Sequence, residues 1–214
     1  KAINPKVKIV GVQTSNIPSM KASLENKKVT SAFNDVTMAD GIAVKTPGDL
    51  TFNTIKDLID EIIVVDEEEI AQAMVFLIEY QKVIAEGAGA VSTAAIWSGK
   101  YQPKKDENVV CIISGGNVDI NTMYRIIDMG LNKCGRRFTF KTHVEDRSGG
   151  LSQVTAILKE LNANILNAYM SKMNSKYGIG KQLVELTIET FNIEHKNEIV
   201  NALINAGFEV YIGE

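Results

Sequence analysis

Residues 108–117 read Asn-Val-Val-Cys-Ile-Ile-Ser-Gly-Gly-Asn, and this stretch decides the fold class. The apolar run that ends at Ile113 is typical of a strand buried on both faces of a parallel sheet. A glycine-containing loop, Ser114–Asn117, follows the run, and residues 120–131 then show helical periodicity. A strand, a turn and a helix in direct succession indicate an α/β architecture.

The residues upstream repeat this alternation of strand and helix. Short strands are predicted over Val7–Val12 and Glu61–Val65, and helices over 49–58 and 86–98. Asp66 stands before three glutamates and is expected to cap the start of a long amphipathic helix. The pattern yields only about three strands, so we expect this region to be part of a larger sheet domain.

The end of the chain has a different pattern. The predicted order is β-α-β-β-α-β, which is that of the ferredoxin-like α+β motif. We place the domain boundary between 135 and 136, which gives domains 1–135 and 136–214. So short a second domain is near the lower limit for a self-sufficient core, and we expect it to pair with another copy. Its strands are predicted at 138–144, 164–173, 182–190 and 208–212, and its helices at 151–161 and 193–206. Gly207 is expected to end the second of these helices.

Composition excludes several classes of protein. The 214 residues hold 23 Lys and Arg against 26 Asp and Glu, a net charge of −3, so no basic field favours nucleic acid as a partner. No apolar stretch approaches the roughly 20 residues of a membrane helix, and we expect no membrane partner. Two cysteines make no disulfide framework, which favours a reducing, cytoplasmic location.

Three motifs in series carry a family resemblance: Asp40–Gly48, Glu86–Ala90 and Ser114–Asp119. Together they resemble the second half of the catalytic domain of threonine dehydratases (threonine ammonia-lyases), which are pyridoxal-phosphate enzymes of the tryptophan-synthase-β fold. Near the end of the chain, Asp146–Leu151 and Asn162–Ile165 resemble an ACT regulatory domain. The resemblance implies a partial fold-type II domain followed by a ferredoxin-like ACT domain.

The resemblance also implies a cofactor site. It assigns pyridoxal 5′-phosphate to Ser114, Gly115, Gly116 and Glu86, with the Ser114 hydroxyl facing the pyridine nitrogen and Glu86 giving polar support. From the residues alone, the loop at Ser114 is as well explained by a plain strand-to-helix turn. Glu86 is as well explained by a helix N-cap.

Two parts of the family's active site are missing from this sequence. The Schiff-base lysine stands in a Ser-Phe-Lys-like motif in that family, and the phosphate is held by a run of four glycines; neither occurs here. The nearest string surrounds Lys141, which we assign to a strand. We therefore expect the chain to begin after the glycine run, to be part of a longer protein, and to be inactive alone, without covalently bound cofactor.

For the end of the chain, the resemblance implies an amino-acid effector, isoleucine or valine. It assigns the effector to Gly149, Gly150 and Leu151 of one copy and to Asn164 and Ile165 of another. The chain is thus expected to form homo-oligomers through its ACT domains. The loop before a predicted helix N-terminus also suits a carboxylate on physical grounds.

No metal site is expected. Some relatives with serine racemase activity bind a divalent cation through carboxylates after the first strand, but no acidic residue occurs from Lys1 to Leu24. His143 and His195 are isolated and lack zinc-site spacing.

The resemblance implies that the parent protein converts L-threonine to 2-oxobutanoate and ammonia, in isoleucine biosynthesis. Two alternatives stay open. One is a serine dehydratase of the same fold, and the other is a non-catalytic fragment that senses amino acids and dimerises.

Overall fold

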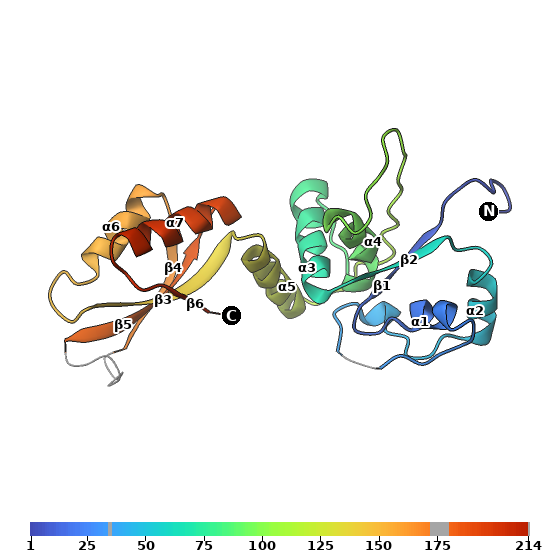
Figure 1. The fold of residues 1–214 in the computed structure, drawn as a ribbon, viewed down its shortest axis with the longest axis horizontal. Helices are drawn as coiled ribbons and strands as arrows, with labels where there is room; N and C mark the ends of the chain where they lie inside the picture. The colour runs from blue at the N-terminus through green and yellow to red at the C-terminus, as the bar shows by residue number, and fades with distance from the viewer. Residues whose placement is uncertain (34–35, 172–179, 214) are drawn as a thin grey trace. The chain divides into compact units, whose positions relative to one another are not determined.

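The computed structural model describes residues 1–33, 36–171 and 180–213. The chain divides into two compact units, Lys1–Gly130 and Leu131–Glu214. Figure 1 labels their helices and strands. The division falls inside helix α5 (Ile120–Lys133), earlier than the boundary expected at 135/136.

The sheet of the first unit has two parallel strands, β1 (Val10–Thr14) and β2 (Glu61–Val65). Val10 pairs with Glu61 and Thr14 with Val65. The bounds of β2 match the prediction. β1 begins later than the Val7 expected from the apolar pattern.

Two long helices supply much of the core of the first unit. Asp66 caps α3 through a capping box, as expected: its carboxylate accepts the Glu69 N–H at 2.9 Å, and the Glu69 carboxylate accepts the Asp66 N–H at 2.7 Å. Ile70 and Met74, one turn apart on this amphipathic helix, are buried. The helical segments before α5 are α1 (Ser19–Glu25), η1 (Asp40–Ile42), α2 (Asp49–Ile55), α3 (Glu67–Phe76), the π-helical turn η2 (Leu77–Gln81) and α4 (Gly87–Trp97).

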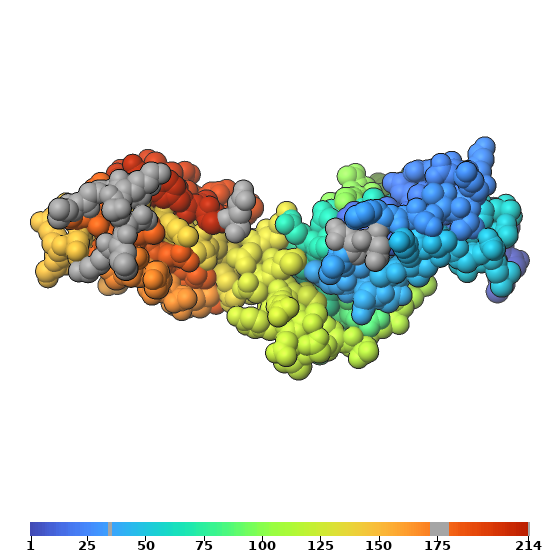
Figure 2. Space-filling view, turned by 90° about the horizontal axis from the view of Figure 1, so that it is seen from below, coloured from blue at the N-terminus to red at the C-terminus, as the bar shows by residue number. Residues whose placement is uncertain are grey.

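The strand predicted over Asn108–Ile113 is wrong for this structure. The segment joins no ladder, and Val110 and Ile112 are 85% and 74% exposed. An apolar run becomes a central strand only where neighbouring strands satisfy its backbone groups. Within the described part of the first unit, β1 and β2 pair only with each other. Figure 2 shows the yellow-green segment that leads into α5 as a lobe on the surface.

The second unit has the chain order β3-α6-β4-β5-α7-β6, which is the order that the sequence pattern predicts. Its antiparallel sheet has the strand order β4-β5-β3-β6. Residues 172–173 of the predicted second strand lie outside the described residues. The elements are β3 (Arg137–Glu145), α6 (Ser152–Glu160), β4 (Asn164–Ser171), β5 (Lys181–Glu189), α7 (Ile193–Asn205) and β6 (Tyr211–Ile212).

Both helices of this unit cover one face of its sheet, as Figure 1 shows. Phe140 and Leu186 are cross-strand partners on that face, and both are fully buried. Gly207, expected to end α7, has φ +90°, and the Phe208 N–H closes the helix on the Leu203 carbonyl. Among the described helices of the chain, none is long and apolar enough to cross a bilayer.

Candidate functional site

The loop Ser114–Asn117 folds against the start of α4. Glu86 occupies the N-cap position, as the sequence allowed, and its N–H donates to the Gly115 carbonyl at 3.0 Å. The Asn117 N–H donates to Glu86 Oε2 at 3.2 Å. The Glu86 carboxylate therefore holds this loop rather than capping its own helix.

The glycines of the loop are required by this close packing. A Cβ on Gly115 would overlap the Glu86 carboxylate, and one on Gly116 would lie 2.7 Å from the Ile84 carbonyl oxygen. A Cβ on Gly89 in α4 would lie 2.6 Å from the Gly115 carbonyl oxygen. The family resemblance assigned Gly115 and Gly116 to the cofactor. In the structure, protein atoms lie where a side chain at either position would be.

A polar network ties the ends of both strands to the segment before η1. Glu67 Oε1 accepts the Thr14 hydroxyl at 3.0 Å and the Thr37 hydroxyl at 2.6 Å, and Glu67 Oε2 accepts the Met38 N–H at 2.6 Å. Thr14, the last residue of β1, is fully buried. Sequence analysis missed Glu67, because three consecutive glutamates indicated only a helix start.

The Asp40–Gly48 motif lies at the same place. A Cβ on Gly41 would lie 3.0 Å from the Ala88 Cβ and 3.6 Å from Glu86 Oε1, and one on Gly87 would overlap the Met38 carbonyl. The structure thus brings the starts of all three sequence motifs together around Glu86. They lie at the carboxyl edge of the β1–β2 sheet, where open α/β folds bind ligands.

Ser114 carries an exposed polar group at this site. Among the described residues, its hydroxyl has no hydrogen-bond partner, and the side chain is exposed. A free neutral hydroxyl beside a backbone turn suits a heterocyclic nitrogen. The side chain that packs on the loop is the Glu86 carboxylate. The residues present therefore fit the ring end of pyridoxal phosphate.

Asp119 closes the Ser114–Asp119 motif and belongs to the start of α5. Its carboxylate accepts the N–H groups of Asn121 and Thr122, each at 3.0 Å. Hydrogen bonds from the side chain and backbone of Thr122 lower the pKa of Asp119. This carboxylate acts as a helix cap.

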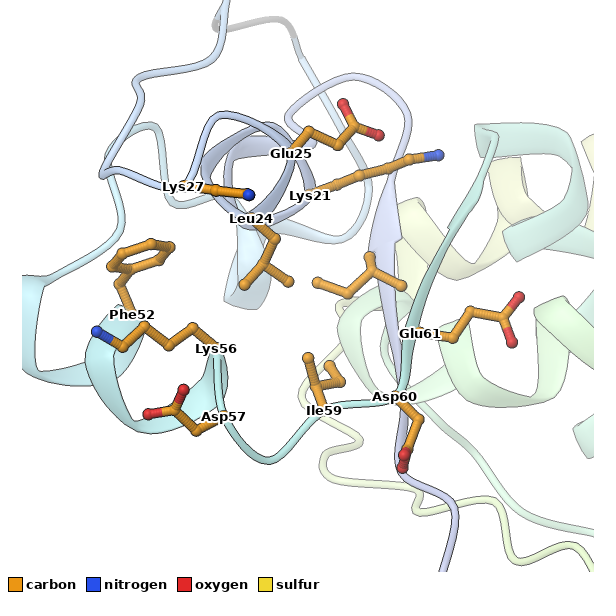
Figure 3. Close-up of a pocket in the computed structure, with 11 residues that line it drawn as sticks. Lys21, Leu24, Glu25, Lys27, Phe52, Lys56, Asp57, Ile59, Asp60 and Glu61 are labelled. Carbon is orange, nitrogen blue, oxygen red and sulfur yellow. The ribbon is translucent and has the colours of Figure 1, made fainter.

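A separate hollow of about 730 Å³ lies between α1, α2 and the start of β2. Figure 3 shows Leu24 and Ile59 directed into it, with the charged end of Glu61 pointing away. Its lining mixes lysines with acidic residues and shares no residue with the Ser114 loop. Nothing in the sequence analysis pointed to this hollow, and its mixed charge selects no ligand class.

In the second unit, the residues assigned to the effector lie in two places. Gly149 has φ +83°, and its carbonyl accepts the Ser152 N–H at 2.9 Å, just before α6. Asn164 follows the far end of α6 and donates its side-chain N–H to Glu189 at 2.7 Å. Nine helical residues separate the two places by roughly 13 Å. One chain therefore does not bring Gly149–Leu151 together with Asn164 and Ile165.

The histidines lie in structured surroundings. His195 is buried, with Nδ1 accepting the Phe191 N–H at 3.1 Å and Nε2 2.7 Å from the Leu161 carbonyl oxygen. Lys141 is a β3 residue, as expected, and pairs with Glu185 at 3.1 Å. Across the ranges that the structure describes, no group of three or more His, Cys, Asp or Glu side chains is placed to hold a metal. The absence of a metal site stays a prediction.

Comparison with known proteins places this geometry in a family. The family model described as "Pyridoxal-phosphate dependent enzyme" matches residues 1–115. The chain belongs to this family. The recognition made from the three motifs is thereby confirmed, and the cofactor that it implied is the one that gives the family its name.

The L-threonine ammonia-lyase of Thermotoga maritima is 46% identical over 212 residues, which are 99% of this chain and 52% of that protein. The processed form of threonine deaminase isoform 2 from Solanum lycopersicum aligns with a TM-score of 0.54 and 32% identity, over 60% of this chain and 38% of its own. Maize serine racemase aligns with a TM-score of 0.54 and 32% identity, over 62% and 41%. The chain spans about half the length of the curated relatives that match its whole length.

Proposed function

We propose that the first unit is part of a pyridoxal-phosphate-dependent threonine ammonia-lyase, whose intact form converts L-threonine to 2-oxobutanoate and ammonia. The observation that carries this proposal is the exposed, unpartnered Ser114 hydroxyl on a loop that Glu86 holds at the carboxyl edge of the sheet. The 46% identity to an L-threonine ammonia-lyase along nearly the whole chain supports the choice of reaction.

Bound pyridoxal phosphate would supply an electron sink for the bond changes at the substrate. In this proposal Ser114 binds the pyridine nitrogen. A hydroxyl is neutral and, unlike a carboxylate, does not hold a proton on that nitrogen, so the sink is weak. A weak sink favours elimination, in which a leaving group takes the electrons at once. Glu86 orients the Ser114 loop through the N–H of Asn117 and is a positioning residue.

The chain by itself is proposed to be inactive. The described residues around the Ser114 loop offer a carboxylate and backbone groups, and the family's lysine motif and glycine run are missing from the sequence. Activity, a cytoplasmic location and a place in isoleucine biosynthesis are therefore proposed for the intact parent protein.

The test replaces Ser114 in the intact parent protein. For Ser114→Asp, which would hold a proton on the ring nitrogen, we expect kcat for threonine to fall at least tenfold, with a changed cofactor absorption spectrum. Ser98→Ala, at the other end of α4, serves as the matched control, and we expect it to leave kcat and the absorption spectrum unchanged. Unchanged kcat and spectrum in Ser114→Asp and Ser114→Ala would remove Ser114 from the cofactor site.

The serine-directed alternative has one observation in its favour, the structural likeness to maize serine racemase. Product analysis of the parent protein separates the reactions. Threonine elimination gives 2-oxobutanoate, serine elimination gives pyruvate, and racemisation gives D-serine. A larger kcat/KM for serine than for threonine would favour the alternative.

For the second unit we propose an ACT regulatory domain that binds isoleucine or valine between two copies. The separation of Gly149–Leu151 from Asn164 within one chain supports a site that needs a second copy. β4 is an edge strand whose Leu166, Tyr169 and Met170 are exposed, which suits edge-to-edge pairing.

Calorimetric titration of the chain with L-isoleucine and L-valine tests this proposal, with D-isoleucine as the control ligand. We expect heat from an L-isomer only, together with a larger mass in solution than one chain. No heat and no thermal shift would remove the effector site. If the chain binds an L-isomer but the intact parent protein has no activity toward threonine or serine, the alternative of a non-catalytic, amino-acid-sensing protein is favoured.

A further inference from the structure

Two of the three glutamates at the start of α3 have different tasks. Glu69 completes the capping box with Asp66 and also pairs with Lys100 Nζ at 2.7 Å. Glu67 takes no part in that cap. Its two carboxylate oxygens accept hydrogen bonds from residues that lie between 29 and 53 positions earlier in the chain. The Glu67 carboxylate therefore serves tertiary contacts rather than the start of its own helix.

The half-buried Glu67 carboxylate is matched to its three donors. One oxygen accepts the hydroxyls of Thr14 and Thr37 at 3.0 and 2.6 Å, and the other accepts the Met38 N–H at 2.6 Å. An ionised carboxylate only accepts, so it can satisfy all three donors at once. Such charge-assisted hydrogen bonds are roughly twice as strong as those between neutral groups. A glutamine would offer a single acceptor oxygen.

The segment before η1 is anchored at further points. The Thr37 hydroxyl accepts the Ala39 N–H at 3.1 Å, and the Asn16 side-chain amide donates to the Val36 carbonyl at 2.6 Å. Ala39 is fully buried in the core of the first unit. These contacts give the segment a fixed path from the end of β1 into η1.

The same segment packs against the start of α4. A Cβ on Gly87 would overlap the Met38 carbonyl and would lie 3.0 Å from the Ala39 nitrogen. α3 and α4 lie side by side in the first unit, as Figure 1 shows. Met38 thus contacts the start of α3 through its N–H, which Glu67 accepts, and the start of α4 through its carbonyl.

The next turn of the chain reaches the Glu86 carboxylate. A Cβ on Gly41, in η1, would lie 3.6 Å from Glu86 Oε1, and one on Gly115 would overlap the same oxygen. The carboxylate is therefore flanked by the segment that Glu67 holds and by the loop that carries Ser114. Because the packing on both flanks is close, a shift of either one would move the carboxylate.

We propose that Glu67 is a positioning residue of the candidate cofactor site. It holds the Met38 segment, and that segment holds Gly41 beside Glu86. Glu86 in turn holds the Ser114 loop. Glu67 thus acts through Glu86 and touches no reacting atom. The effect on catalysis rests on the proposed threonine ammonia-lyase function, whereas the series of contacts belongs to this chain alone.

Hydrogen exchange of this chain, without cofactor, tests the contacts. The control is Asp66→Ala, which removes the cap of the same helix and leaves Glu67 in place. We expect the Met38 amide to exchange at least tenfold faster in Glu67→Ala than in this control. The Glu86 amide, which donates to the Gly115 carbonyl, should exchange at least threefold faster, although Glu67 does not bind it. Equal exchange of the Glu86 amide in the two variants would overturn the proposal.

Kinetics of the intact parent protein separate positioning from stability. We expect Glu67→Gln to lower kcat for threonine at least tenfold and to change the cofactor absorption spectrum. KM should change less than threefold, because the proposed effect is on the loop at the cofactor ring. Asp66→Ala and Glu68→Gln, at an exposed neighbour, should keep kcat and the spectrum. An unchanged kcat and spectrum in Glu67→Gln, or the same changes in Asp66→Ala, would contradict a positioning role.

Thr37 gives a second way to break the same contact. Thr37→Val removes the hydroxyl at nearly constant volume and should lower kcat at least threefold, whereas Thr37→Ser keeps the hydroxyl and should restore most of the activity. The double variant with Glu67→Gln should lose no more than Glu67→Gln alone, since both changes remove one interaction. Losses that multiply in the double variant would show that the two residues act independently and would count against the proposal.

This inference and the proposed function fail in different ways. Linked exchange at Met38 and Glu86, in a parent protein without activity toward threonine, would remove the proposed reaction and would support the coupling of Glu67 to Glu86. A parent protein that is active and sensitive to Ser114→Asp, but indifferent to Glu67→Gln, would remove the positioning role and leave the reaction standing.

Discussion

The two sheets of this chain differ in how far their backbone groups are paired. In the second unit, Phe140 and Leu186 lie on paired central strands and are fully buried under two helices. In the first unit, β1 has one partner, and the equally apolar segment 108–113 has none among the described residues. Hydrophobic residues alone do not build a sheet, because each strand also needs neighbours for its N–H and C=O groups.

The largest expected effect lies in the closed core of the second unit. Phe140→Ala should lower its free energy of unfolding by about 3–5 kcal/mol, because the fully buried ring leaves a cavity. Urea unfolding followed by far-UV circular dichroism measures this loss. Phe191→Ala, at a 69% exposed phenylalanine, is the matched control and should cost much less.

The single tryptophan, Trp97, lies in α4 and reports on the first unit alone. Its fluorescence transition should stay unchanged in Phe140→Ala. Equal shifts of both transitions would show that the two units unfold together, which would break the comparison.

An intermediate effect is expected at two capped helices, α3 in the first unit and α7 in the second. Asp66→Ala removes the acceptor of the Glu69 N–H, and Asn192→Ala removes the acceptor of the His195 N–H at 2.8 Å. Each should cost about 1 kcal/mol. Asp66→Ala should lower the urea midpoint of the Trp97 fluorescence transition. Asn192→Ala should leave that transition unchanged and should change only the unfolding of the second unit, followed by far-UV circular dichroism. Asp66→Asn and Asn192→Asp keep an acceptor and should stay near the original stability.

The smallest effect concerns the pH dependence of the first unit. The Ile9 N–H at 2.7 Å, and then Lys1, lower the pKa of Asp60 below its ordinary value of 3.8. The ionised form stabilises the fold above that value, and this contribution is lost as pH falls through the folded pKa. Unfolding of the chain between about pH 5 and about pH 2 should therefore depend less on pH in Asp60→Asn. An identical dependence would exclude Asp60 as a contributor.

Local chemistry made much of the fold predictable. Asp66 before three glutamates, Gly207 after α7 and the alternation along β3 and β5 depend on neighbours within a few residues, and the structure has each as predicted. The strand at 108–113 failed because its pairing depends on distant chain. Glu67 was missed for a related reason, since its three hydrogen-bond donors come from residues 14, 37 and 38.

The sequence by itself determined the family, the order of strands and helices in the second unit, and the helix caps at Asp66 and Gly207, because motifs, periodicity and caps are written in neighbouring residues. Only the tertiary structure decided that Glu86 holds the Ser114 loop, that Gly115 and Gly116 make room for protein atoms, and that β1 keeps an open edge. Those facts depend on contacts between segments far apart in the chain, where packing distance and hydrogen-bond direction set the outcome.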